Sequence, residues 1–151
     1  MTRDLPPTID PVAAARWASL ALGAGMHPIG ADVASPWLHE EVARRMEERL
    51  GWIKLQPQQW AHWEAVRGGL QAHGLLTRRY PKAVCFVVED SAARAKFATE
   101  ALAKPWWSPA RWTAAPVQVG LPPDGGVQML WSNMLLHQVA DPQALISRWH
   151  R

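Results

Sequence analysis

The sequence has little cysteine, no strong excess of positive or negative charge and no long apolar run. Its single cysteine, Cys85, excludes an internal disulfide framework and is typical of a reducing compartment. The net charge is +3, and acidic and basic residues alternate along the chain, so no basic patch indicates nucleic acid. No run of about 18 apolar residues occurs, and the first residues lack the apolar core of a signal peptide. We therefore expect a cytoplasmic protein with neither a nucleic-acid nor a membrane partner.

The composition indicates a globular protein. Hydrophobic residues make up 48% of the 151 residues and charged residues 19%, which fits one domain with a substantial core. Ten tryptophans supply large apolar surfaces for a core or an interface.

Two helices are predicted to precede the first strand. Asp10-Pro11 is typical of a helix start, and the glycine-rich stretch 23–34 of a loop. A second helix is predicted from Pro36 to Leu50, with Ser35 as its N-cap. We divide the chain into an N-terminal helix and loop, residues 1–34, and a main domain, residues 35–151.

Strands alternate with helices along the main domain. The pattern predicts strands at 52–55, 83–88, 117–119 and 127–132, and helices at 58–67, 70–80, 92–103 and from Asp141-Pro142 onward. Ala83 to Val88 is continuous and β-branched, as in a strand buried on both faces. The alternation predicts an α/β, Rossmann-like fold: a mostly parallel sheet of about four strands with helices on both faces.

Three patterns resemble one known family. Glu89-Asp90-Ser91 follows a strand, and Leu121-Pro-Pro-Asp-Gly-Gly126 precedes the fourth strand. The fourth strand ends at Ser132-Asn133, and Leu136-His137 and Asp141-Pro142 come after it. These residues resemble class I S-adenosylmethionine-dependent methyltransferases of the "type 11" group, and most closely the malonyl-acyl-carrier-protein methyltransferase branch of biotin synthesis. The resemblance implies S-adenosylmethionine as cofactor, and a small molecule or a carrier-protein-bound carboxylate as methyl acceptor.

The sequence departs from that family at the glycine-rich turn after the first strand. Bare backbone there lets the cofactor lie against the turn. Aligned without gaps, the glycine positions hold Gln56, Gln58 and Trp60, Pro57 enters the turn, and Lys54 replaces the acidic residue. Side chains at these positions are expected to crowd the cofactor.

Family members continue past the last helix into further strands, whereas this sequence ends at Arg151. We expect either a fragment or a shortened protein. In a shortened protein, Val127 to Ser132 becomes an exposed sheet edge. Pairing with a second copy would cover that edge and produce a homodimer.

Four residues are candidates for cofactor binding. The resemblance implies that Glu89 binds the ribose hydroxyls, with Asp90 sharing this role, and that Ser132 and Asn133 lie at the ligand crevice. The alternatives are a solvated charge at the strand end for Glu89, and ordinary strand-end hydrogen bonds for Ser132 and Asn133. No catalytic residue is assigned, because methyl transfer depends mainly on proximity.

The remaining polar and aromatic residues give weaker signals. The six histidines are scattered without metal-ligand spacing. His137 is either a substrate contact or a structural histidine, and Cys85 is expected in the core. Four tryptophans could line a ligand or partner surface or pack in the core: Trp60, Trp63, Trp106 and Trp107. Two functions stay open: a methyltransferase, or a degenerate, non-catalytic relative that acts by self-association or partner binding.

Overall fold

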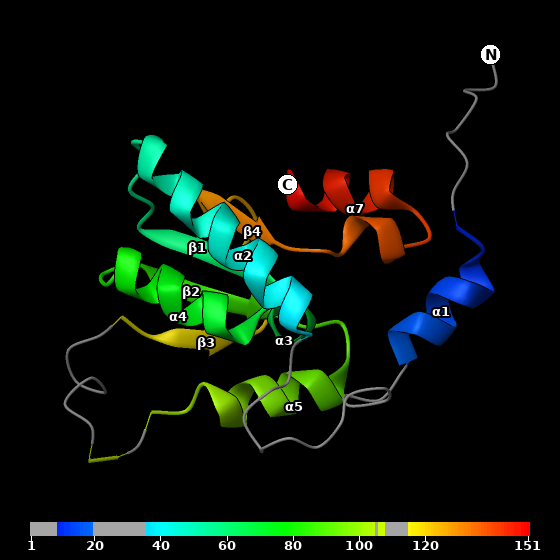
Figure 1. Cartoon of the computed structure of the whole chain (residues 1–151), viewed down its shortest axis with the longest axis horizontal. Helices are drawn as coiled ribbons and strands as arrows, with labels where there is room; N and C mark the ends of the chain where they lie inside the picture. Colours follow the sequence, from blue (N-terminus) through cyan, green and yellow to red (C-terminus); the bar gives the residue numbers. More distant parts are fainter. Residues whose placement is uncertain (1–8, 20–35, 105, 108–114) are drawn as a thin grey trace.

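The computed structural model describes residues 9–19, 36–104, 106–107 and 115–151 (Figure 1). The helices are α1 (Pro11–Ser19), α2 (Trp37–Arg49), α3 (Ala65–Gly68), α4 (Leu70–Arg79), α5 (Ala92–Ala101) and α7 (Pro142–Trp149), with 3-10 turns η1 (Leu50–Trp52) and η2 (Leu136–Gln138). The strands are β1 (Gln59–Trp63), β2 (Val84–Val88), β3 (Val117–Val119) and β4 (Met129–Ser132).

The strands form one parallel sheet in the order β3-β2-β1-β4. Helices cover both faces (Figure 1). Ala43 of α2, Leu76 of α4 and Ala98 of α5 belong to the core on one face, whereas Trp149 of α7 packs on Trp63 at the other. The predicted α/β, Rossmann-like architecture with two leading helices is therefore confirmed.

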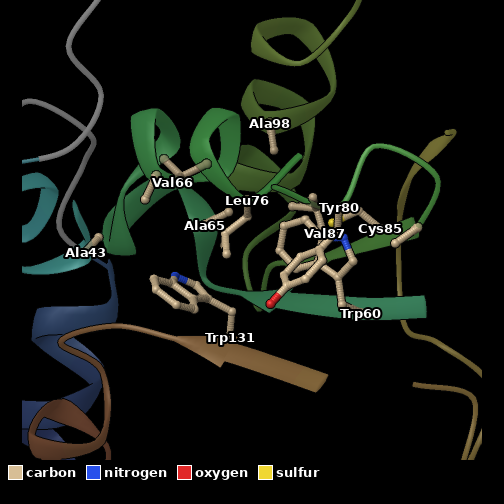
Figure 2. Close-up of a cluster of buried hydrophobic side chains, with 12 residues drawn as sticks. Ala43, Trp60, Ala65, Val66, Leu76, Tyr80, Cys85, Val87, Ala98 and Trp131 are labelled. Carbon is tan, nitrogen blue, oxygen red and sulfur yellow. The ribbon is translucent and has the colours of Figure 1, made fainter. Parts of the chain in front are cut away.

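Successive residues of the central strand β1 serve opposite faces of the sheet, as in any strand. His62 stacks on His73 of α4, and Trp60 lies in the same layer with its ring centroid 5.4 Å from that of His73. Trp63 faces α7 instead. The main core cluster forms between the sheet and helices α2, α4 and α5, where Figure 2 shows its side chains gathered around Leu76.

The position predicted for the first strand is wrong. The chain forms the turn η1 at Leu50–Trp52, and 53–55 is exposed, with the side chain of Trp52 88% exposed. The strand lies instead at Gln59–Trp63, within the helix predicted at 58–67. Trp60 and Trp63 have helical spacing, but pairing with β2 on one side and β4 on the other stabilises the extended form.

The other elements of the main domain agree with the prediction to within a few residues. β2, β3, β4, α2, α4 and α5 each lie inside the predicted ranges. Asp141 caps α7, because its carboxylate accepts a hydrogen bond of 2.8 Å from the Ala144 N–H. Ser91 precedes α5 but makes no capping hydrogen bond through its side chain.

Some predictions fall on residues that the structure does not describe. The Ser35 cap and the loop 23–34 lie outside the described residues. Within the described part of the chain, no helix is long and apolar enough to cross a bilayer.

Candidate functional site

The carboxyl ends of β1 and β2 are adjacent in the sheet, and each is followed by a glutamate. Trp63 pairs with Val88 at the ends of the two strands, and Glu64 and Glu89 come next. In the sheet order β3-β2-β1-β4, strands β2 and β3 lie on one side of β1 and β4 lies on the other. The order in which the chain adds strands therefore reverses between β1 and β4. Ligands of open α/β sheets bind in the crevice at such a point.

Glu64 has a left-handed backbone conformation, with φ 53° and ψ 51°. Such a conformation is uncommon for a non-glycine residue and has to be stabilised by its surroundings. Here the Glu64 N–H donates to the Val88 carbonyl at 2.7 Å, and its carboxylate accepts from the Asp90 N–H at 2.7 Å. Glu64 therefore fastens the end of β1 to the end of β2.

Arg94 of α5 lies between the two glutamates. Its Nη2 is 3.0 Å from Glu64 Oε1, and its Nε is 3.3 Å from Glu89 Oε2. The other oxygen of Glu89, Oε1, accepts from the Val66 N–H at 2.8 Å. All three charged side chains are buried. We call Glu64, Glu89 and Arg94 the strand-end cluster.

The surroundings of Glu89 in this cluster shift its pKa. Burial raises the pKa of Glu89 to about 7, and the negative charge of Glu64 acts in the same direction. The Val66 N–H and Arg94 oppose this shift, because both stabilise the ionised form. Both carboxylates thus share one guanidinium in a water-poor setting.

Of the predicted site residues, Glu89 and Asp90 lie side by side but face differently. The Glu89 carboxylate points into the protein toward α3 and Arg94, although its backbone is partly exposed. Asp90 is exposed, and its carboxylate is 3.9 Å from Arg148 of α7. Asp90 takes part in the cluster only through its backbone N–H.

Ser132 is the last residue of β4 and Asn133 follows it, and the two have contrasting surroundings. The Asn133 side-chain amide donates to the carbonyls of His39 at 2.8 Å and Gly68 at 2.6 Å, which ties α2 and α3 to β4. The Ser132 hydroxyl is buried and has no hydrogen-bond partner among the described residues.

The turn after β1 is not where the gap-free alignment with the methyltransferase glycine pattern placed it. Because β1 begins at Gln59, Gln56 and Gln58 precede the strand and Trp60 lies in it, so these side chains do not occupy the turn. The turn contains Gly68 and Gly69 instead. A Cβ at Gly68 would lie 3.3 Å from the Asn133 carbonyl oxygen, and a Cβ at Gly69 would lie 2.8 Å from Glu40 Oε2. Both glycines make room for neighbouring protein.

Histidines form a second buried group that the sequence did not indicate. The rings of His62 and His73 stack with their Nδ1 atoms 3.4 Å apart, and His62 Nε2 lacks a partner among the described residues. Burial lowers the pKa of both, that of His73 to about 4. His137 lies exposed on η2 beside Gln138. In the described ranges no three metal-ligating side chains come together.

The other singled-out side chains divide between core and surface. Cys85 is buried, as predicted, and Trp60 and Trp63 are buried too, whereas Trp106 and Trp107 are exposed. Comparisons of the chain with protein-family models, with curated proteins and with solved structures give no match.

Proposed function

We propose that this chain is a methyltransferase-like domain that acts by self-association and no longer transfers methyl groups. The observation that supports this proposal most is the position of Arg94 between Glu64 and Glu89. A ribose bound at the end of β2 needs an acidic side chain with oxygens free to accept two hydroxyl hydrogens. Both oxygens of Glu89 already accept, from Val66 and from Arg94.

Opening the cluster for a cofactor would be costly. Moving Glu89 toward a ribose would remove one carboxyl partner of the buried Arg94 and leave Glu64 beside it, and a lost hydrogen bond to a charged group costs roughly 1.5–3 kcal/mol. The two glycines of the turn offer no compensating space, since Asn133 and Glu40 lie against them. The strand-end cluster therefore favours a structural role for Glu89.

The edge of the sheet supports self-association. The Glu64 N–H donates to Val88 of β2, so the backbone groups of the preceding residue, Trp63, face β4. In a parallel pair, a residue whose backbone groups face the neighbouring strand lies opposite a residue whose groups face away. Ser132 lies opposite Trp63, so its N–H and C=O point away from β1, as do those of Leu130 two residues earlier. Among the described strands β4 pairs only with β1, which leaves these groups for an added strand. A twofold axis at this edge would pair β4 with its copy in antiparallel fashion.

Light scattering on three versions of the chain tests the self-association. The native chain and Leu130→Ala, which keeps the backbone N–H, are expected to have the mass of a dimer. Leu130→Pro removes an outward N–H and no bond to β1, so it is expected to be a folded monomer. A native chain that stays monomeric at high concentration, or a dimeric Leu130→Pro, would contradict pairing through β4.

Calorimetric titration with S-adenosylmethionine tests the loss of the cofactor. We expect no binding heat with the ligand at about 1 mM. A dissociation constant of that size corresponds to only about 4 kcal/mol of binding free energy, so even weak binding would be detected. Saturable binding in the micromolar range would refute a non-catalytic role.

Methyl transfer is the second candidate, and the placement of Glu89 favours it. Glu89 directly follows β2, and the turn after the neighbouring strand β1 contains Gly68 and Gly69. This function would use a small-molecule or carrier-protein-bound carboxylate as acceptor, including one of biotin synthesis. Transfer of a labelled methyl group to an acyl-carrier carboxylate, abolished in Glu89→Ala, would support this candidate against the first.

A further inference from the structure

A hollow lies on the α7 side of the sheet, away from the strand-end cluster. Its volume is about 290 Å³, close to the lower end of the roughly 300–1,000 Å³ of small-molecule sites. The end of α7, the segment 121–127 that leads from β3 to β4, and two strand residues, Trp63 and Leu130, line it.

Three buried hydrogen-bond donors gather at this side of the sheet. Trp63 Nε1, Trp149 Nε1 and Ser132 Oγ have no hydrogen-bond partner among the described residues. Trp63 and Ser132 are register partners, so their side chains project to the same face, and the Trp63 and Trp149 rings meet edge to face with centroids 5.7 Å apart. A buried polar group without a partner costs about 1–3 kcal/mol. The indole N–H groups can only donate, and therefore call for an acceptor.

A cation stands beside these donors. The guanidinium of Arg148 lies 4.8 Å from the centre of the Trp63 ring, and Arg148 also lines the hollow. Its contact with Asp90 is long, 3.9 Å, and partly exposed, so it is worth little. The planar fork of an arginine suits the two oxygens of a carboxylate.

The rest of the lining combines apolar and polar residues. Leu121, Pro122, Pro123, Val127 and Leu130 are apolar, whereas His150, Arg151 and the exposed Asp124 are polar or charged. We propose that the hollow binds a small carboxylate with an apolar acyl or aryl body. The carboxylate pairs with Arg148 and accepts from the indole N–H groups as they turn toward it, and the apolar body lies against Leu130 and Pro122. This site differs from the surface of the self-association proposed above: it uses the side chain of Leu130 on the α7 face of the sheet, whereas pairing through β4 would use outward backbone groups.

Nuclear magnetic resonance of the ten indole N–H groups tests the site. Trp63→Phe and Trp149→Phe assign the two signals, and the native chain is then titrated with phenylacetate, with the neutral phenylacetamide and with the cationic 2-phenylethylamine. We expect phenylacetate to shift the Trp63 and Trp149 signals saturably, and at least tenfold weaker binding for the other two compounds.

Arginine variants distinguish recognition of the ligand charge by Arg148 from non-specific binding. Arg148→Gln is expected to weaken phenylacetate binding at least tenfold. Arg44→Gln, which removes an exposed arginine of α2, is expected to leave binding unchanged. The unshifted indole signals report in each case that the variant is folded.

Three results would overturn the proposal. One is the absence of shifts at Trp63 and Trp149 up to about 10 mM phenylacetate, beyond the range of even a weak fragment. The second is equal binding of phenylacetamide, and the third is full binding by folded Arg148→Gln.

Discussion

The ring of His62 in β1 lies parallel to that of His73 in α4, with an interplanar angle of 9° and centroids 5.6 Å apart. This stack is at the centre of the sheet-to-helix core, where no water reaches His62. Two neutral imidazoles therefore occupy a position at which a protonated pair would be strongly disfavoured. The stability of the fold depends on pH through this contact.

We expect the histidine stack to destabilise the protein in acid. Burial, followed by the charge of Lys104, lowers the pKa of His73 to about 4, and burial with the charge of His73 lowers that of His62. The unfolded chain takes up protons below about pH 6.5, whereas the folded chain resists until about pH 4, so the free energy of unfolding falls as the pH falls between these values. For His73 alone the loss approaches about 3 kcal/mol. Urea unfolding at pH 7.5 and pH 4.5 measures it.

The matched variant for this prediction is His73→Phe, which keeps an aromatic ring over His62. The loss of unfolding free energy between pH 7.5 and pH 4.5 should be smaller in the variant, by about the 3 kcal/mol expected for His73 alone. An unchanged difference would show that His73 is already protonated in the folded state at pH 4.5.

Glu89 should act in the opposite direction. Its folded pKa is raised, mainly by burial, to about 7, so the folded chain holds a proton between pH 4.5 and 7 that the unfolded chain has released. The free energy of unfolding therefore falls as the pH rises through this range. Glu89→Gln removes this dependence. Between pH 5 and pH 8 the native chain should lose about 2–3 kcal/mol of unfolding free energy that the variant keeps.

Asp90→Asn is the control for Glu89→Gln, because Asp90 is the neighbouring, exposed carboxylate. This control measures what the loss of a neighbouring, exposed carboxylate does by itself, and the effect of Glu89→Gln should exceed it. If Glu89→Gln behaves like Asp90→Asn in paired urea titrations, the carboxyl of Glu89 is ionised throughout, and Arg94 dominates over burial.

Local sequence predicted most elements because their signals are local. The β-branched run of β2 and the Asp141-Pro142 start of α7 need no distant partner. β1 differs, since Gln59–Trp63 contains no β-branched residue and becomes a strand through its place between β2 and β4. A strand shifted along the chain also shifts the turn that follows it, which is why the gap-free comparison examined the wrong residues.

The candidate site shows the same limit. Glu89 could be found because it directly follows a recognisable strand. Its partner in the strand-end cluster, Glu64, could not, because it follows the strand that was misplaced and contacts Arg94, 30 residues away. The position of Arg94 between the two glutamates likewise depends on tertiary contacts, and no spacing in the sequence indicates it.

Asn133 should matter for stability and its neighbour Ser132 should not. Asn133→Ala leaves the buried carbonyl of Gly68 and the partly buried carbonyl of His39 without this donor, which should lower the free energy of unfolding by about 2–4 kcal/mol. Ser132→Ala removes a buried hydroxyl without a partner among the described residues, so the change should stay within about 1 kcal/mol. Urea unfolding of the two variants side by side checks this order. Equal losses would mean that the Asn133 amide is not bonded as in the structure.

Two glycines at one helix should respond oppositely to alanine. Gly69 has φ 131°, and an added Cβ would lie 2.8 Å from the Glu40 carboxylate, which accepts from the first N–H groups of α4 at Gln71 and Ala72. Gly69→Ala therefore strains the backbone and displaces this cap, so we expect a loss of more than about 2 kcal/mol. Gly74 lies within α4, and the nearest atom to its Cβ, 3.6 Å away, ends the flexible side chain of Arg78. Gly74→Ala should gain about 0.5–1 kcal/mol, because alanine favours the helix. Thermal unfolding of both variants measures the two effects, and a Gly69→Ala protein as stable as the native chain would show that Glu40 does not cap α4.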